Sequence, residues 1–288
     1  MLYLLIAVFA GSCKGFCGKK ISGSVTGIYD SIAMSVIRMF FCCVIGFSVA
    51  AMQGGSFSIT PVKGGIYLLS GISMAVFLIS WLLAVRGGAF MLINAFTTAS
   101  FLVTTIFGFA VFKERITLKQ IVGMLFIVAA IILLIKYNNR IKAKMSVKDF
   151  LMLLVVLVSQ GLTNVSQKMF TAWVPDGSNA VFNFYTFLIT FVLLAVWFAC
   201  MSVKNAGPQF KLKSTVGYIA VMAVMLFLNS YFLTAATKHM PSVVLYPLSS
   251  VLSLTAATVM AAVFFKEKIT KTSAAGILCT FVSVMLTR

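Results

Sequence analysis

Few side chains in this sequence have the chemistry of a catalytic or metal-binding centre. His239 is the only histidine, and it lies in the short polar segment Lys238-His239-Met240-Pro241. A catalytic triad or a metal site needs several suitable groups, and no second histidine is present. The carboxylates are predicted near helix ends: Asp30, Glu114, Asp149, Asp176 and Glu267. Since no glycine-rich phosphate loop occurs either, we expect a protein that is not an enzyme and holds no metal or cofactor.

The cysteines do not form a disulfide framework or a zinc pattern. They lie within apolar runs: Cys13, Cys17, Cys42, Cys43, Cys200 and Cys279. Cys13 and Cys17 share one helical face, but no histidine or further cysteine lies near enough in sequence to complete a coordination sphere. We interpret all six as small packing residues.

Two cations, Lys14 and Arg38, lie inside long apolar runs. An ionisable group within a bilayer is costly and marks a pathway by default. Lys14 also lies in the small-residue segment 11–15, which permits close helix approach. In the alternative interpretation, Lys14 extends to the membrane interface and Arg38 caps a neighbouring helix end. We expect at least one of the two to border a central cavity.

Neutral polar and aromatic side chains complete the candidate substrate site. We select them because they lie within the apolar runs, several at matching positions in the two halves of the chain: Trp81, Asn94, Thr98, Asn164, Tyr185, Asn229, Tyr231 and Tyr246. Several of these candidates will instead make interhelical hydrogen bonds, worth about 0.6 kcal/mol each in membranes. Pro247 occupies the position of Asn94 in the second half, and it predicts a broken or kinked ninth helix because proline removes a backbone donor.

The composition places these residues in a polytopic membrane protein. The 288 residues are 61% hydrophobic and 10% charged, against about 25% charged in a soluble domain. The net charge of +18 lies in short segments between apolar runs. It forms no continuous basic stripe, so we expect contact with lipid headgroups and no nucleic-acid binding. Met1 opens directly into an apolar run, so no cleavable signal is predicted.

A membrane-spanning helix needs about 20 apolar residues. Ten runs meet this requirement approximately: 1–18, 29–51, 65–85, 89–112, 118–136, 150–170, 180–202, 216–237, 242–265 and 272–287. The fold class is therefore all-α, with ten transmembrane helices.

An internal duplication relates the two halves of the chain. Phe112-Lys113-Glu114-Arg115-Ile116-Thr117 returns as Phe265-Lys266-Glu267-Lys268-Ile269-Thr270, and each copy is a predicted turn between two spans. The basic segment 137–149 separates residues 1–136 from residues 150–288, with five spans in each. Because five is odd, the second copy enters the bilayer from the opposite side. Inverted five-helix repeats of this kind are a transporter architecture.

The motifs around this duplicated turn resemble those of the drug/metabolite transporter superfamily, in particular its ten-helix EamA-type members. In the first half they are Ala84 to Ala89, Asn94 to Ser100, Gly108 to Phe112, Glu114 and Gln120-Ile121-Val122-Gly123; in the second they are Ala235 to Lys238, Ser242, Glu267, Ile269-Thr270, Ala274-Ala275 and Gly276. The resemblance covers essentially the whole chain. It implies a secondary transporter of small metabolites or drugs without a cofactor, and it names no substrate.

The charge pattern separates the functional hypotheses. With Lys14 and Arg38 inside the spans and no carboxylate predicted at mid-membrane, a small neutral or anionic polar metabolite is the favoured cargo. The alternatives are export of organic cations or drugs, recognised by cation–π contacts with Trp81, Tyr185 and Tyr231, and a membrane scaffold without transport. A coupling ion, the direction of transport and a monomer or homodimer stay open.

Membrane orientation is predicted differently by charge and by resemblance. Fourteen Lys and Arg residues lie in the loops after odd-numbered spans and seven in the remaining loops and C-terminus. The positive-inside rule therefore puts the odd loops in the cytoplasm and both termini outside, in a multi-pass cell-membrane protein. The resemblance implies cytoplasmic termini.

Overall fold

The computed structural model describes residues 2–24, 27–87, 90–113, 117–141, 146–203, 212–240, 242–266 and 270–287. Over these ranges the chain is helical and contains no strand, as the apolar runs predicted. The helices are α1 (Leu2–Ile21), the 3-10 turn η1 (Ser22–Ser24), α2 (Ile28–Met52), α3 (Pro61–Gly87), α4 (Phe90–Ala99), α5 (Phe101–Phe112), α6 (Leu118–Ile141), α7 (Val147–Trp173), α8 (Asn179–Ser202), α9 (Leu212–Thr237), α10 (Ser242–Val263) and α11 (Lys271–Thr287).

Seven of the helical segments within the described ranges are long and apolar enough to cross a membrane: Leu2–Ser24, Ile28–Met52, Pro61–Val85, Leu92–Phe112, Val147–Trp173, Asn179–Ser202 and Thr215–Thr237. Large apolar side chains remain exposed along them, among them Phe9, Phe40, Phe47, Leu68, Ile72 and Trp197. An apolar surface on this scale is expected where lipid replaces water as the solvent.

The fourth predicted span is two helices, α4 and α5, which meet at Ser100. The Ser100 amide donates to the Thr97 carbonyl at 3.3 Å, a 3-10 contact that tightens the chain at this point. Gly161 of α7 packs against the break: a Cβ there would lie 2.5 Å from Cβ of Val103 and 2.9 Å from the Ser100 carbonyl oxygen. The break that we expected at Pro247 is absent, because α10 runs continuously from Ser242 to Val263.

Within the basic segment 137–149, α6 continues to Ile141 and α7 begins at Val147. A capping box fixes the start of α7. The Ser146 hydroxyl accepts from the Asp149 amide at 3.2 Å, and the Asp149 carboxylate accepts from the Ser146 amide at 3.0 Å. These bonds satisfy two backbone donors that a helix start leaves unpaired, so helix formation extends into the polar segment.

One residue of the duplicated turn, its lysine, is left-handed in both halves. Lys113 follows α5 with φ 53° and Lys266 follows α10 with φ 51°. Left-handed residues of this kind end helices by capping their last carbonyls, and the Lys113 amide donates to the Gly108 carbonyl. The remaining charged residues of the turns, including Glu114 and Glu267, lie outside the described residues. Asp30 and Asp149 lie in first helical turns, as predicted.

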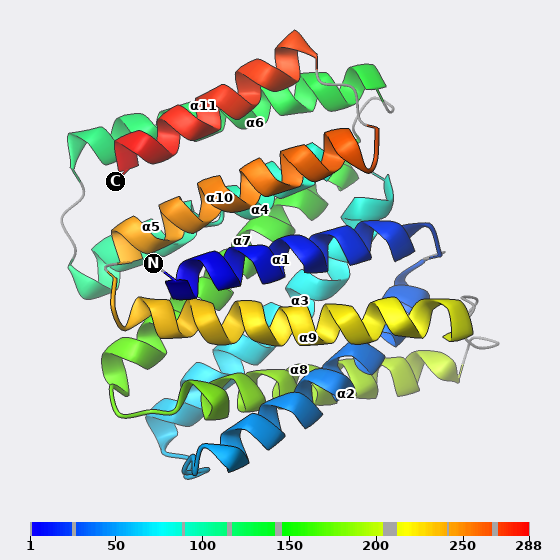
Figure 1. The fold of residues 1–288 in the computed structure, drawn as a ribbon, viewed down its shortest axis with the longest axis vertical. Coiled ribbons are helices and arrows are strands. Elements are labelled where there is room, and N and C mark those ends of the chain that lie inside the picture. The colour runs from blue at the N-terminus through cyan, green and yellow to red at the C-terminus, as the bar shows by residue number, and fades with distance from the viewer. Residues whose placement is uncertain are drawn as a thin grey trace.

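Each main helix pairing joins the two halves of the chain (Figure 1). Helix α1 packs along α9 and α3 along α7, while α2 pairs with α8, α4 with α10 and α6 with α11. The α6 and α11 pair lies at one end of the bundle (Figure 1). The chain termini lie on the same side of the structure (Figure 1).

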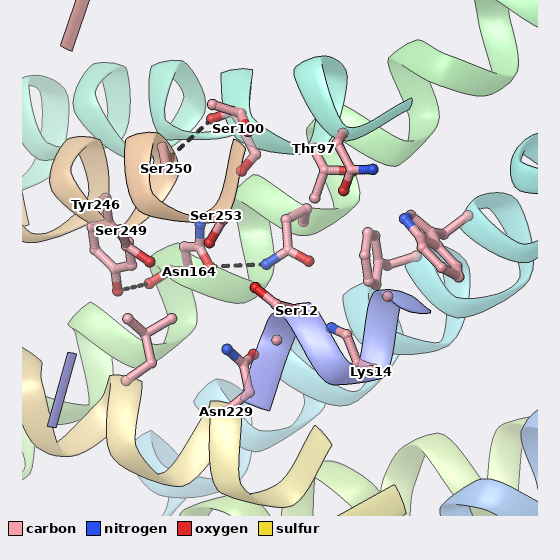
Figure 2. A pocket seen from close by; sticks show the side chains of 18 of the residues that line it. Ser12, Lys14, Thr97, Ser100, Asn164, Asn229, Tyr246, Ser249, Ser250 and Ser253 are labelled. Atoms are coloured by element: carbon pink, nitrogen blue, oxygen red, sulfur yellow. Dashed lines mark hydrogen bonds between the residues drawn. The ribbon is translucent and has the colours of Figure 1, made fainter. Parts of the chain in front are cut away.

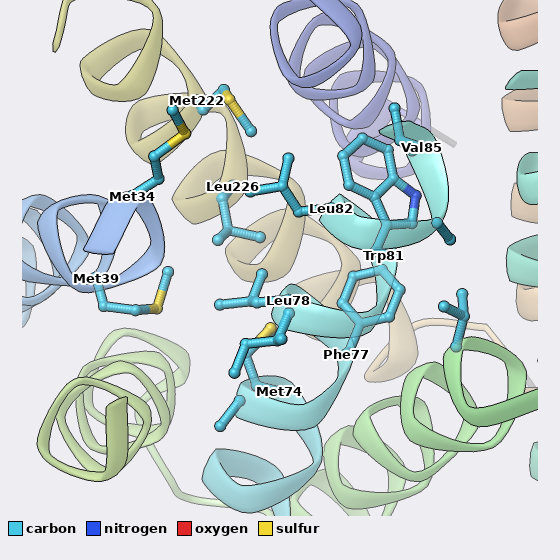
Figure 3. Close-up of a cluster of buried hydrophobic side chains, with 14 of the residues drawn as sticks. Met34, Met39, Met74, Phe77, Leu78, Trp81, Leu82, Val85, Met222 and Leu226 are labelled. Atoms are coloured by element: carbon cyan, nitrogen blue, oxygen red, sulfur yellow. The ribbon is translucent and has the colours of Figure 1, made fainter. Parts of the chain in front are cut away.

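The largest apolar core includes side chains of α1, α2, α3, α4, α7, α8 and α9, and one part of it lies between α2, α3 and α9. Figure 3 shows methionines of α2, α3 and α9 interleaved with Leu78, Leu82 and Leu226. Met39, Leu82 and Met222 are each at most 1% exposed. Methionine fills irregular gaps between helices, so this core holds the helices that flank the site described next.

Candidate functional site: a polar cavity between the two halves

A cavity of about 120 Å³ lies between helices of the first half and helices of the second. Its walls come from α1, α3, α4, α7, α9 and α10, and polar side chains converge on it (Figure 2). The volume has room for a small metabolite or several waters, since one water needs about 10–15 Å³ on this measure. Of the ten residues selected from the sequence, seven line it: Lys14, Trp81, Asn94, Thr98, Asn164, Asn229 and Tyr246.

Lys14 supplies the cavity's charge. Its ammonium lies 5.8 Å from the ring centre of Phe77 and has no hydrogen-bond or carboxylate partner among the described residues. Figure 2 shows it on the α1 wall, across the cavity from the α4 and α10 side chains. The cavity-lining residues that the structure describes include no carboxylate. Lys14 therefore faces the cavity, and not the membrane interface of our alternative interpretation.

Glycines of α1 allow the other walls to approach Lys14 closely. A Cβ at Gly11 would lie 3.0 Å from the Asn229 amide nitrogen, which donates to the Ala7 carbonyl at 2.7 Å. A Cβ at Gly18 would lie 2.7 Å from the Trp81 ring. Gly11, within the predicted small-residue segment 11–15, thus admits the Asn229 amide, and Gly18, beyond that segment, admits the Trp81 ring.

Hydrogen bonds fix the walls formed by α7 and α10. The Tyr246 hydroxyl donates to the Asn164 carbonyl at 2.8 Å, and the Gln160 amide donates to the Asn164 side-chain oxygen at 3.0 Å. Near the break in the fourth span, the Ser250 hydroxyl donates to the Thr98 carbonyl at 3.2 Å. These bonds leave part of each polar group's capacity open for a ligand.

Three of the selected residues lie elsewhere. Arg38 is 4% exposed in the α2, α3 and α9 core, beside a gap with no room for water, and it donates to the Ser35 hydroxyl at 3.3 Å. Tyr185 stacks on Tyr67 with ring centres 4.9 Å apart and donates to the Phe57 carbonyl. Tyr231 accepts from the Gln53 amide at 3.0 Å. Their helices are apolar on all sides, so the sequence pattern did not indicate which face turns inward.

Several cavity residues were missed as candidates: Gly11, Ser12, Gly15, Phe77, Ser100, Gln160, Leu233, Ser253 and Met260. Helical spacing carried a signal for two of them. Gln160 precedes Asn164 by four residues and Phe77 precedes Trp81 by four, so each pair shares a helix face.

Within the described ranges, no three His, Cys, Asp or Glu side chains lie close enough together to hold a metal ion. His239 lies in the exposed turn after α9 and stacks on Tyr3, with ring centres 5.8 Å apart. These observations and the apolar helices define a membrane protein with a central polar cavity.

The first half of the chain is similar to a known family. Residues 1–136 match the EamA-like transporter family, which agrees with the resemblance to the drug/metabolite transporter superfamily. Over these residues the chain therefore resembles membrane transporters of the drug/metabolite type. No curated protein matches the chain.

One solved structure, titled only as the crystal structure of a protein, superposes with a TM-score of 0.72. Its sequence is 14% identical, and the match covers 99% of this chain and 94% of the other. At this identity the match supports the fold alone.

Proposed function

We propose that the protein is a secondary transporter that moves a small polar metabolite through the central cavity by alternating access, and that the cargo is neutral or anionic. The observation that carries this proposal is Lys14, a cation facing the cavity without a described carboxylate partner. A buried ammonium costs several kcal/mol unless water or an anion compensates it. A cargo carboxylate or another anionic group in the cavity provides that compensation.

The proposed architecture is two inverted repeats of five spanning helices, residues 1–136 and 150–288. The pairing pattern supports it. In this proposal α7, α8, α9, α10 and α11 are the counterparts, in order, of α1, α2, α3, the α4 and α5 pair, and α6. The contact of α1 with α9 is then the counterpart of the contact of α7 with α3. Helices α2, α4 and α6 each pack against their own counterparts, α8, α10 and α11. Such reciprocal pairs are expected of a pseudo-two-fold arrangement, and inverted-repeat transporters bind their cargo at the interface between the repeats.

Organic-cation export has less support. Of the three aromatic residues suggested for cation–π recognition, only Trp81 lines the cavity. Tyr185 and Tyr231 make the contacts described above outside it. The ammonium of Lys14 also repels a cationic cargo.

A thermal-shift panel of purified protein tests the proposal. The probes are lactate and succinate as anions, glycine as a zwitterion, glucose as a neutral polar molecule and choline as a cation. We expect at least one anionic or neutral probe to raise the melting temperature in a concentration-dependent way, because a ligand that binds only the folded state stabilises it. Stabilisation by choline alone would favour the organic-cation alternative.

Lys14→Met provides the site-specific arm, with Lys63→Met as a control at a partly exposed lysine in the first turn of α3, outside the cavity lining. We expect Lys14→Met to lose the shift produced by an anionic probe and to remain monodisperse, while Lys63→Met keeps the shift. A panel in which no probe shifts the melting temperature of a monodisperse protein would support the scaffold alternative.

A further inference from the structure

A short motif containing Lys14 occurs a second time in the chain. Ser12-Cys13-Lys14-Gly15-Phe16 in α1 has the same serine, lysine and phenylalanine spacing as Ser166-Gln167-Lys168-Met169-Phe170 in α7. The offset is close to that of the duplicated turn, and α1 and α7 are the first helices of the two halves. Lys168 is therefore the counterpart of Lys14.

The two lysines have related but unequal surroundings. Both ammonium groups lie over an aromatic ring, Lys14 over Phe77 at 5.8 Å and Lys168 over Phe112 at 4.6 Å. Lys14 is partly exposed and lines the cavity, whereas Lys168 is 8% exposed and does not. The Lys14 side chain thus reaches the cavity in this structure, whereas the Lys168 side chain is packed away from it.

An apolar layer closes the cavity on the Lys168 side. It consists of Leu4, Ala7, Val8, Ala99, Phe101, Leu233, Ala236, Leu245 and Tyr246, each at most 8% exposed. The layer joins the start of α1, the end of α9 and the start of α10. Tyr3 stacks on His239, and the Lys238 ammonium donates to the Pro175 carbonyl. These contacts place the three helix ends on the same side of the structure as the end of α7. Asn164, four residues before Lys168 and on the same helix face, already lines the cavity.

We infer that Lys168 enters the pathway and contacts the cargo in the state that opens on the opposite side, where it takes the role that Lys14 has here. This inference rests on the proposed function. In inverted repeats the two halves exchange conformations between the two access states, so counterpart residues exchange environments. An anionic group then meets a cation on either side of the apolar layer.

Cysteine accessibility in membrane vesicles tests this inference without knowledge of the cargo. Lys14→Cys and Lys168→Cys are made separately in a background in which the six native cysteines are replaced, and each is labelled with a membrane-impermeant methanethiosulfonate in vesicles of both orientations. We expect the two positions to be labelled from opposite sides of the membrane. If the cysteine-free protein is not monodisperse, the native background is used and the labelled residue is identified by mass spectrometry.

Leu245→Ala, which weakens the apolar layer, tests for alternation. We expect labelling at 168 to become about threefold faster and labelling at 14 to become slower, because the populations of the two states shift together. Leu194→Ala removes an equally buried leucine of α8 outside the layer and should produce no such reciprocal change. Two outcomes would overturn the inference and leave the proposed function standing. In both, position 14 is labelled; in the first, position 168 is not labelled, and in the second, Leu245→Ala does not change the rate of labelling at 168. Failure to label either position would count against the cavity pathway itself.

Discussion

The Tyr246 hydroxyl donates to the Asn164 main-chain carbonyl at 2.8 Å and so joins α10 to α7 at the wall of the central cavity. Tyr246 is 3% exposed and also belongs to the apolar layer that closes one side of the cavity. One residue therefore contributes a polar contact to the site and packing to the closed state.

Tyr246→Phe is expected to separate these contributions. It keeps the ring and removes the hydroxyl, so we expect a loss of about 0.6 kcal/mol of stability, the average for an interhelical hydrogen bond in a membrane. The matched control is Tyr218→Phe, since Tyr218 is 41% exposed on α9. Melting temperatures of the two purified variants provide the measurement. Equal melting temperatures for the variants and the parent would show that the hydroxyl contributes no stability.

The packing of α3 on α8 is predicted to depend on Gly71. A Cβ there would lie 2.5 Å from Cγ2 of Ile189 and 3.3 Å from the Thr186 carbonyl oxygen. Gly71→Ala should therefore destabilise the protein by about 1–3 kcal/mol through overpacking. Gly65→Ala in the same helix meets nothing within 4 Å and should be neutral or slightly stabilising. Thermal unfolding of both variants checks this contrast, and equal destabilisation would contradict the close approach.

The capping box of α7 is predicted to stabilise the junction between the halves. Ser146→Ala removes the hydroxyl that accepts from the Asp149 amide, and loss of such a cap costs about 0.5–2 kcal/mol. Ser146→Asp retains an acceptor and should restore most of the loss. Limited proteolysis of the junction, together with the melting temperature, measures the effect. Faster cleavage in Ser146→Asp than in Ser146→Ala would argue against the capping explanation.

Orientation in the membrane remains a prediction. The structure places the described ends of the chain, near Leu2 and Thr287, on the same side (Figure 1), so reporters fused at the two ends should give the same answer. The charge distribution predicts that this side is external, because fourteen cations lie in the odd loops and seven elsewhere. Alkaline phosphatase and green fluorescent protein fusions make the measurement. A cytoplasmic C-terminal reporter would refute the charge-based orientation and agree with the family resemblance.

The sequence by itself determined the helical fold class, the approximate positions of the helices, the duplicated turn and the resemblance to a transporter family. The physical reason is local. A bilayer requires about 20 apolar residues per helix whatever its neighbours are, because each backbone polar group must be paired within its own segment. The turn at Lys113 and its copy at Lys266 could be found in the same way, since one hexapeptide specifies one left-handed cap.

The tertiary structure alone decided which polar residues meet. Lys14 and Arg38 look alike in sequence, as single cations in apolar runs, yet one faces the cavity and the other packs in the α2, α3 and α9 core. The sequence also showed no sign of the break in the fourth span, because a serine such as Ser100 is permitted within a helix. The contacts beside the break come from other helices: Gly161 of α7 packs against it, and the Ser250 hydroxyl of α10 donates to the Thr98 carbonyl. A helix that is apolar on every side carries no pattern that orients it, so the direction of each polar side chain depends on the helices that pack around it.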